Sequence, residues 1–163
     1  TYKERLKTIT ILNSVCNRTK EQRDAVLNRV EEVKKVGAEA SVEPAIKRWF
    51  TSSFIEENEG VINNIRTRLE TNNPTSYLAA DTPFATANRE LWDQLQNIEV
   101  PTLIMTSEND IGSTPEMAKQ MHEKINGSSM KILPTLRHMS PIEGAEIVNN
   151  ELRLFLESHS TSK

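Results

Sequence analysis

Two short apolar segments in the second half of the chain constrain its fold most strongly, because each leads into a residue suited to proton transfer. Residues 101–107 run toward Asp110, and residues 130–134 run toward His138. Each of these two residues is followed by a Thr-Pro or Ser-Pro pair, which is typical of a helix that carries proline at its first position. The resulting order of strand, helix, strand and helix predicts parallel strands joined by a crossover helix.

If these strands are parallel neighbours, Asp110 and His138 emerge at the same carboxyl edge of the sheet, where open α/β folds bind their ligands. A carboxylate that orients an imidazole allows the imidazole to take a proton from a hydroxyl group or a water molecule. We therefore predict that Asp110 is an orienting acid and that His138 is a general base. Glu108 is the competing acid, and an ordinary turn aspartate with an inert loop histidine is the simpler alternative.

Composition excludes several classes of function. The chain has 163 residues, which suits one domain or a domain with an inserted lobe, and its net charge of -3 is spread along the sequence. The lack of a Lys/Arg cluster argues against nucleic acid, and the lack of a long apolar run argues against a membrane partner. A single cysteine, Cys16, fits a reducing compartment, so we expect the cytoplasm. No phosphate loop or metal-ligand spacing is present, so we expect neither cofactor nor metal.

The order of the expected elements gives the domain organisation. Residues 1–17 contain a first core strand, residues 18–97 form a run of helices, residues 98–157 form the β-α-β-α end, and residues 158–163 are a disordered polar tail. This organisation predicts an α/β fold of about three parallel strands with flanking helices and a helical cap inserted after the first strand.

The helix boundaries rest on local sequence patterns. The first helix is expected to start with a capping box, Thr19 to Gln22, and to end at Gly37. Further helices are expected over about 44–50 and 58–69, then over 77–80 and from residue 82 onward. The last helix is expected to begin with a second capping box, from Ser140 to Glu143.

Candidates for other site residues are weaker. Ser14 and Cys16 follow the first strand, but no glycine flanks them as a nucleophile turn requires, so we predict that Cys16 is a buried thiol. Aromatic residues of the helical part are expected mainly in its core. Trp49, Phe50 and Tyr77 are candidates for contact with a small-molecule substrate.

Several segments resemble the C-terminal half of an α/β-hydrolase. Residues 6–14 look like its sixth strand, residues 100–110 like its seventh strand with the acid, and residues 136–138 like its histidine loop. The separation of Asp110 and His138 along the chain is typical of the family. Within the helical part, residues 48–51 and 77–80 resemble the cap of 3-oxoadipate enol-lactonases and related hydrolases of small esters.

The resemblance implies hydrolysis of a small carboxylic ester or lactone by a Ser-His-Asp triad, whose members occur in that chain order. The Gly-x-Ser-x-Gly nucleophile turn and the oxyanion loop would precede Thr1, and neither is found in the sequence. One oxyanion donor alone contributes roughly 3–4 kcal/mol to such a reaction. We therefore expect the chain to be inactive alone and its activity to belong to a longer parent protein.

Three alternatives remain open at this point. The nucleophile of the parent could be an aspartate, as in dehalogenases and epoxide hydrolases. The chain could also be a non-catalytic α/β interaction module, or an independent small domain that lacks no upstream strand. A sheet with an exposed edge could pair with a second copy, so a homo-oligomer or a domain swap is a further expectation.

Overall fold

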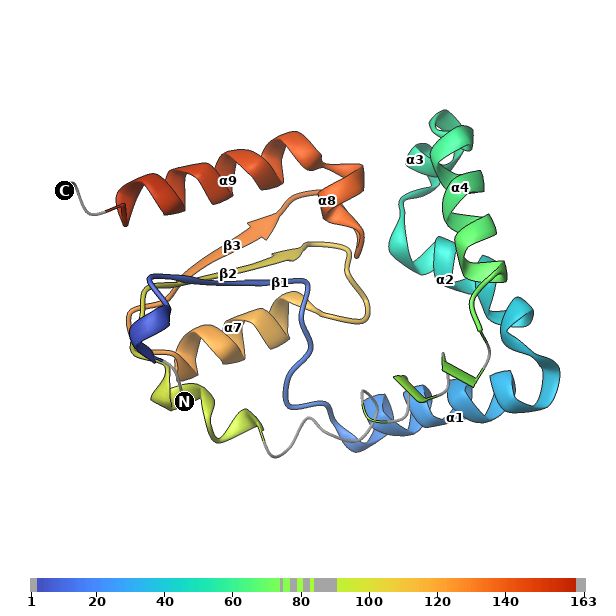
Figure 1. Cartoon of the computed structure of the whole chain (residues 1–163), viewed down its shortest axis with the longest axis horizontal. Coiled ribbons are helices and arrows are strands. Elements are labelled where there is room, and N and C mark those ends of the chain that lie inside the picture. The colour runs from blue at the N-terminus through green and yellow to red at the C-terminus, as the bar shows by residue number, and fades with distance from the viewer. Residues whose placement is uncertain (1–2, 74, 77–78, 81–82, 84–90, 161–163) are drawn as a thin grey trace.

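The computed structural model describes residues 3–73, 75–76, 79–80, 83 and 91–160. Its centre is a parallel sheet in the order β1-β2-β3, formed by β1 (Ile9–Leu12), β2 (Thr102–Ser107) and β3 (Ser129–Leu133). The three strands run side by side with their carboxyl ends at one edge (Figure 1). The predicted α/β fold with three parallel strands and flanking helices is confirmed.

One helix covers each face of the sheet (Figure 1). Every residue of β2 is buried, and its side chains alternate between the two faces. Ile104 packs with α7 (Pro115–Lys124), whereas Leu103 and Met105 pack with α9 (Ala145–Ser158). The apolar run that predicted this strand is therefore apolar because both of its faces are covered.

The helix after β2 starts as expected. Thr114 Oγ1 accepts a hydrogen bond from the backbone N of Met117 at 3.3 Å, and Pro115 occupies the first helical position. Helix α7 then connects β2 to β3, so Asp110 and His138 follow neighbouring strands. The local pattern was sufficient here because the cap and the proline act within one turn.

The prediction of a capping box at Ser140 is wrong. The structure has a short helix α8 (Ser140–Glu143) that starts after Met139 without a side-chain cap, and α9 begins separately at Ala145. The Ser140 hydroxyl donates to Asn13 Oδ1 at 2.8 Å, and the Glu143 carboxylate bonds to Thr51. Both side chains are used in contacts with distant parts of the chain instead of capping a helix.

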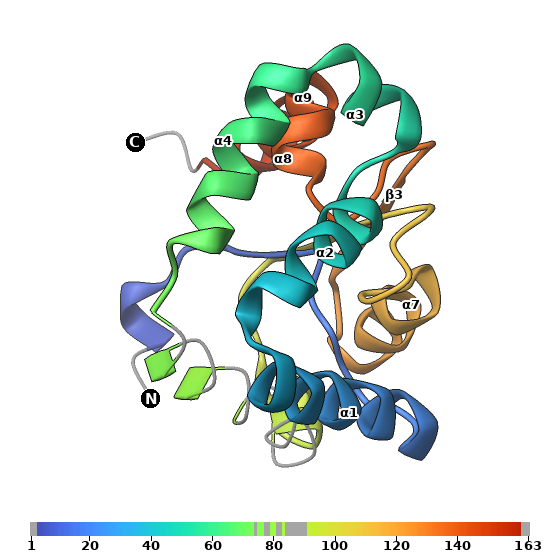
Figure 2. The same ribbon diagram turned by 90° about the vertical axis from the view of Figure 1, so that its right-hand side faces the viewer.

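The helices between β1 and β2 form a lobe beside the sheet, which we call the helical lobe (Figures 1 and 2). It contains α1 (Lys20–Val36), α2 (Val42–Trp49), α3 (Ser52–Glu57) and α4 (Glu59–Glu70). The predicted capping box of α1 is confirmed, since Gln22 N donates to Thr19 Oγ1 at 3.2 Å and Thr19 N donates to Gln22 Oε1 at 2.9 Å. Helix α3 was not expected; the Thr51 hydroxyl caps it.

An apolar cluster joins α2 to α4 inside the helical lobe. Its buried members are Val42, Ile46, Phe50 and Ile62. Met139, which follows His138 directly, packs against this cluster, and its backbone N donates to the carbonyl of Trp49 at 3.0 Å. The loop after β3 is thus attached to the lobe as well as to the sheet.

Some expectations fall outside the described residues. The helix predicted over residues 77–80 and the start of the next one at residue 82 lie largely there, as does Tyr77. Among the described ranges, no helix has the length and apolar character needed to cross a membrane.

Candidate active site

The loops after β2 and β3 are bonded to each other at the carboxyl edge of the sheet. The backbone N of Glu108 donates to the carbonyl of Leu133 at 2.8 Å, and the backbone N of Asn109 donates to that of Leu136 at 3.0 Å. These two bonds continue the β2-β3 pairing beyond the strands and bring the acid loop and the histidine loop together.

Asp110 and His138 are in direct contact, as predicted from the strand order. Asp110 Oδ2 lies 2.8 Å from His138 Nδ1. The side chain of Asp110 is 1% exposed, whereas that of His138 is 33% exposed. The carboxylate is therefore enclosed by protein, while the imidazole reaches the surface of a cavity.

The carboxylate of Asp110 accepts four hydrogen bonds. Oδ1 accepts from the backbone N of Gly112 at 2.9 Å and of Ser113 at 2.8 Å, and Oδ2 accepts from Asn13 Nδ2 at 2.9 Å and from His138. Burial alone would raise the pKa of Asp110, but the bonds from His138, Ser113 and Asn13 outweigh burial and lower this pKa. The group is therefore a carboxylate, which can only accept hydrogen bonds.

This charge state determines the tautomer of His138. Because Asp110 accepts, His138 Nδ1 must carry the proton that it donates, so in the neutral form of the ring the lone pair is on Nε2. A histidine in this form can take a proton at Nε2 while the carboxylate stabilises the imidazolium that results.

Asn13 is a site residue that sequence reasoning missed. It follows β1 with a φ of 45°, a conformation that asparagine tolerates better than most residues. Its Nδ2 donates to Asp110, and its Oδ1 accepts from the buried hydroxyl of Ser140 at 2.8 Å. Asn13 thereby connects the acid loop with the segment just after His138. Its place at the end of a core strand was the only available indication.

Glu143 fastens the histidine loop to the helical lobe. Its Oε1 accepts from the backbone N of Thr51 at 2.9 Å and from the Thr51 hydroxyl, and its Oε2 accepts from the backbone N of Arg137 at 3.0 Å. The guanidinium of Arg137 also donates to the carbonyl of Lys47 on α2. His138 therefore sits between two anchored neighbours, Arg137 and Met139.

Two other candidates near the site, Glu108 and Cys16, make hydrogen bonds to the backbone of the fold. Glu108, the competing acid, accepts from the backbone N of Thr135 at 2.9 Å, whereas it is Asp110 that bonds to His138. Cys16 is buried, as predicted, and its thiol donates to the carbonyl of Met117 at 3.2 Å. Burial raises the pKa of the Cys16 thiol to about 11, so it is a poor nucleophile at neutral pH.

The aromatic candidates separate into three cases. The Trp49 ring lies 6.5 Å from the His138 ring, centroid to centroid, and lines the same cavity. The structure corrects the expectation for Phe50, which is fully buried in the lobe core and stacked on Phe54 at 5.2 Å. Its ring faces the lobe interior because that core needs a large apolar side chain. Tyr77 lies outside the described residues.

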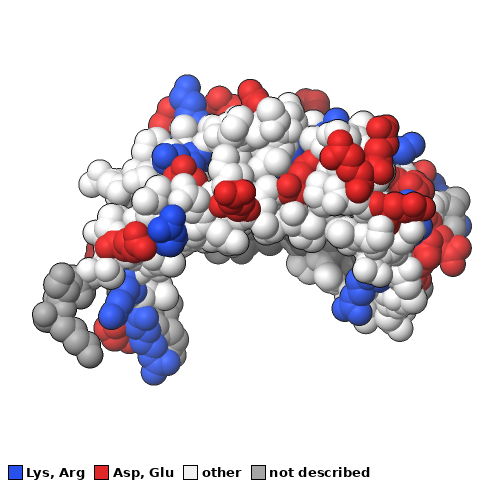
Figure 3. Space-filling model, turned by 90° about the horizontal axis from the view of Figure 1, so that it is seen from above, with Lys and Arg blue, Asp and Glu red and all other residues white. Residues whose placement is uncertain are grey.

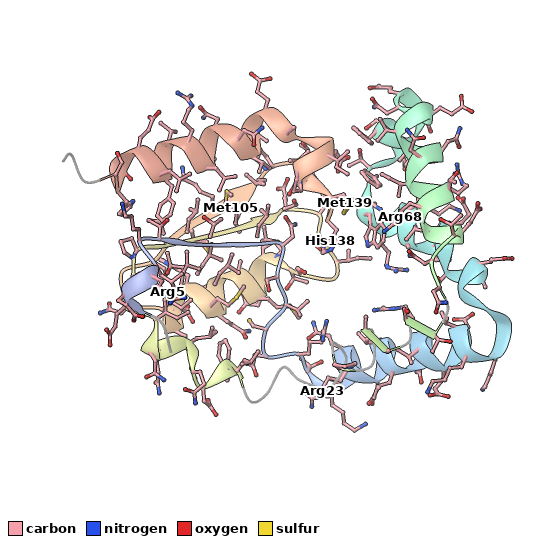
Figure 4. All side chains as sticks on the ribbon, in the orientation of Figure 1. Arg5, Arg23, Arg68, Met105, His138 and Met139 are labelled. Carbon is pink, nitrogen blue, oxygen red and sulfur yellow. The ribbon has the colours of Figure 1, made fainter. Side chains whose placement is uncertain are left out.

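A cavity of about 340 Å³ lies between the sheet edge and the helical lobe. Figure 4 shows His138 at the end of the sheet part that faces the lobe. Asp110 and His138 line the cavity from the sheet side, and Val26 of α1 and Trp49 of α2 line it from the lobe side. Within the described ranges, no group of three His, Cys, Asp or Glu side chains could hold a metal ion. The arrangement is thus a carboxylate-imidazole pair that opens into a cavity.

Comparison with known proteins gives consistent relatives, although no family model matches the chain. A curated (E)-2-((N-methylformamido)methylene)succinate hydrolase from Acinetobacter baylyi is 31% identical over 153 residues, which cover 94% of this chain and 57% of that protein. The 3-oxoadipate enol-lactonase 2 of the same organism is 24% identical over 156 residues, covering 96% and 57%. A thermophilic esterase from Thermogutta terrifontis superimposes with a TM-score of 0.82 at 25% identity, covering 98% of this chain and 59% of that one.

The coverage is as informative as the identity. The chain spans about 57% of the length of the curated relatives, while nearly all of its own length is matched. The chain is thus similar in sequence and in fold to the α/β-hydrolase superfamily, and it has the architecture of the C-terminal portion of those enzymes.

Proposed function

We propose that Asp110 and His138 are the acid and the base of a Ser-His-Asp triad in a hydrolase of small carboxylic esters or lactones. The contact between Asp110 Oδ2 and His138 Nδ1 at 2.8 Å carries this proposal. It is supported by the cavity beside the imidazole and by the likeness to hydrolases, which include an enol-lactonase and an esterase.

In the proposed reaction, His138 Nε2 takes the proton of a serine hydroxyl as the serine oxygen attacks the carbonyl carbon of the ester. The imidazolium then gives this proton to the departing alkoxide, which leaves an acyl-enzyme. His138 next takes a proton from water, the hydroxide adds to the acyl carbon, and the serine leaves with the proton. Asp110 holds the imidazole in place and stabilises its positive charge in both halves of the reaction.

The serine of this proposal comes from polypeptide outside the 163 residues. The sequence contains no Gly-x-Ser-x-Gly segment, and Cys16 is 6% exposed with a raised pKa. We accordingly propose that this chain alone does not hydrolyse esters, and that it supplies the base, the acid and the helical cover of the site.

The test is hydrolysis of p-nitrophenyl acetate by a polypeptide that joins this chain to a segment with the Gly-x-Ser-x-Gly nucleophile turn. His138→Ala should reduce kcat to the background of the chain alone, whereas the variant His122→Ala, on α7, should retain it. His122 is a matched control because it is also a half-buried histidine with a hydrogen bond, to Ser128. Undiminished turnover in His138→Ala would refute the proposal.

A further inference from the structure

A ring of hydrogen bonds joins the ends of all three strands at the candidate site. Asn13 follows β1, Asp110 follows β2, and both His138 and Ser140 follow β3. Asp110 Oδ2 lies 2.8 Å from His138 Nδ1 and 2.9 Å from Asn13 Nδ2. On the other side of the amide, Asn13 Oδ1 accepts from the Ser140 hydroxyl at 2.8 Å. The backbone of Met139 closes the ring, because only this residue separates His138 from Ser140.

The charge of Asp110 determines the direction of every bond in this ring. A carboxylate only accepts hydrogen bonds, so the NH₂ end of the Asn13 amide faces Asp110 and its carbonyl end faces Ser140. The Ser140 hydroxyl must then be a donor. The O–H and N–H dipoles of this series therefore all point toward the carboxylate, which is the arrangement in which linked hydrogen bonds strengthen one another.

Asp110 depends on these donors because water does not surround it. Its side chain is 1% exposed, and it is the one buried acidic residue among those that the structure describes. Many other acidic side chains lie at the surface, and they gather over the α3-α4 end of the lobe (Figure 3). A surface carboxylate is hydrated, whereas a buried one must be stabilised by protein donors. The bond from Asn13 is one of those that lower the pKa of Asp110.

The two oxygens of Asp110 are held in different ways. Oδ1 accepts from two backbone N atoms of its own turn. Oδ2 is the oxygen that contacts His138, and its other donor among the described residues is Asn13. Asn13 is itself fixed at both ends, because its backbone N donates to the carbonyl of Met105 at 2.9 Å and its side chain accepts from fully buried Ser140.

We propose that Asn13 and Ser140 are positioning residues for the proposed acid-base pair. Ser140 holds the carbonyl end of the Asn13 amide, and the NH₂ end holds Asp110 Oδ2 at the place where it orients the imidazole. This inference rests on the proposed function and adds two residues that act through the acid. The segment that carries the base thereby helps to hold the acid, since Ser140 follows His138 by two positions.

The test is NMR of the ¹⁵N-labelled 163-residue chain, in which the ring nitrogen shifts of neutral His138 give the ratio of its two tautomers. Asn13→Gly removes the amide and also relieves the positive φ of residue 13, so backbone strain does not obscure the loss of the side chain. The ratio of Nε2-protonated to Nδ1-protonated ring should rise about fivefold. Ser140→Ala should raise it by a smaller factor, about twofold, because the amide stays in place.

A double variant and a control complete the design. If Ser140 acts through Asn13, the variant with both substitutions should have the same tautomer ratio as Asn13→Gly alone. Thr102→Val is the matched control, because Thr102 is 1% exposed and its hydroxyl donates to the carbonyl of Val100 at 2.9 Å, at the opposite end of β2. Its tautomer ratio should equal that of the original chain. Circular dichroism melts verify that all variants are folded.

The outcomes are distinct. A lower melting temperature with an unchanged tautomer ratio in Asn13→Gly would overturn the proposal, because the role of Asn13 would then be structural only. A ratio that moves toward the Nδ1-protonated ring would also overturn it, since Asn13 would then compete with His138 for Oδ2. Additive effects of the two substitutions would overturn the action of Ser140 through Asn13. Because these spectra need no nucleophile, the tautomer ratio can shift as expected when ester hydrolysis fails, so this proposal and the proposed function fail separately.

Discussion

The two members of the Asp110-His138 pair are held by different parts of the molecule. The carboxylate of Asp110 is 1% exposed and is fixed by two amides of its own turn and by Asn13, all at the sheet edge. The imidazole of His138 is 33% exposed, and the loop that carries it is tied to the helical lobe through Glu143 and the backbone of Met139.

This difference implies that a substitution can disturb the acid without disturbing the base, or the base without disturbing the acid. The position of the acid depends on the sheet part, whereas the position of the base depends on the sheet part and on the lobe jointly. Changes around Asp110 should therefore alter folding stability, and changes at the lobe contacts should alter mainly the surroundings of His138.

The largest effect is expected for Asp110→Ala. This variant leaves four hydrogen-bond donors at the sheet edge without their acceptor, so we expect a loss of about 3–5 kcal/mol in the free energy of unfolding. Urea denaturation measures this loss, with Glu108→Ala as the control, since exposed Glu108 accepts a hydrogen bond from the backbone N of Thr135. A loss no larger than that of the control would show that the sheet edge does not depend on this carboxylate.

A smaller loss is expected for Asn13→Ala. The variant removes a donor to Asp110 and the acceptor of the buried Ser140 hydroxyl, which together should cost about 1–3 kcal/mol in unfolding free energy. Asn13→Gly is the matched comparison, because glycine relieves the strain of a positive φ while removing the same side chain. If Asn13→Ala, which loses these bonds without relief of the strain, is as stable as the original chain, the side-chain bonds of Asn13 contribute nothing.

Glu143→Gln tests the lobe side of the comparison. A neutral amide accepts more weakly than a carboxylate, so the bonds to Thr51 and to Arg137 N should weaken and cost about 1 kcal/mol or less. Hydrogen exchange at the Thr51 amide should accelerate, and the His138 ring resonances should shift in NMR spectra. Glu146→Gln, at an exposed position of α9, should change neither. An unchanged His138 spectrum would mean that the lobe does not position the base.

The pH dependence of the free energy of unfolding tests the contribution of Asp110. The pKa of Asp110 in the folded protein lies below its ordinary value of 3.8, so the unfolded chain binds a proton more readily than the folded one. The stability that this difference contributes is complete above the ordinary pKa and is lost as pH falls through the folded pKa. Urea denaturation at decreasing pH should show this loss in the original chain and a shallower decline in Asp110→Ala. Parallel declines would contradict the lowered pKa.

The sequence predicted those features that depend on neighbours along the chain. The capping box at Thr19 and the helix start at Thr114-Pro115 were predicted correctly because their bonds close within one turn. The meeting of Asp110 with His138 followed from the order of two adjacent parallel strands. These patterns involve neighbouring elements of the chain, so few alternative structures compete with the predicted one.

The features that were missed depend on partners far along the chain. Ser140 and Glu143 have the spacing of a capping box, yet Asn13 and Thr51 take their side chains into tertiary contacts. Phe50 is fully buried because α2 and α4 pack around it, which no local pattern reveals. Asn13 gave no indication beyond its place after a strand.

The central claim is that Asp110 fixes the tautomer of His138, and NMR of the ¹⁵N-labelled chain tests it most directly. The account predicts that neutral His138 carries its proton on Nδ1, with Nε2 unprotonated, and that Asp110→Ala shifts the ring toward the Nε2-protonated form. A ring protonated on Nε2 in the original chain, or the same tautomer mixture in both proteins, would contradict the account.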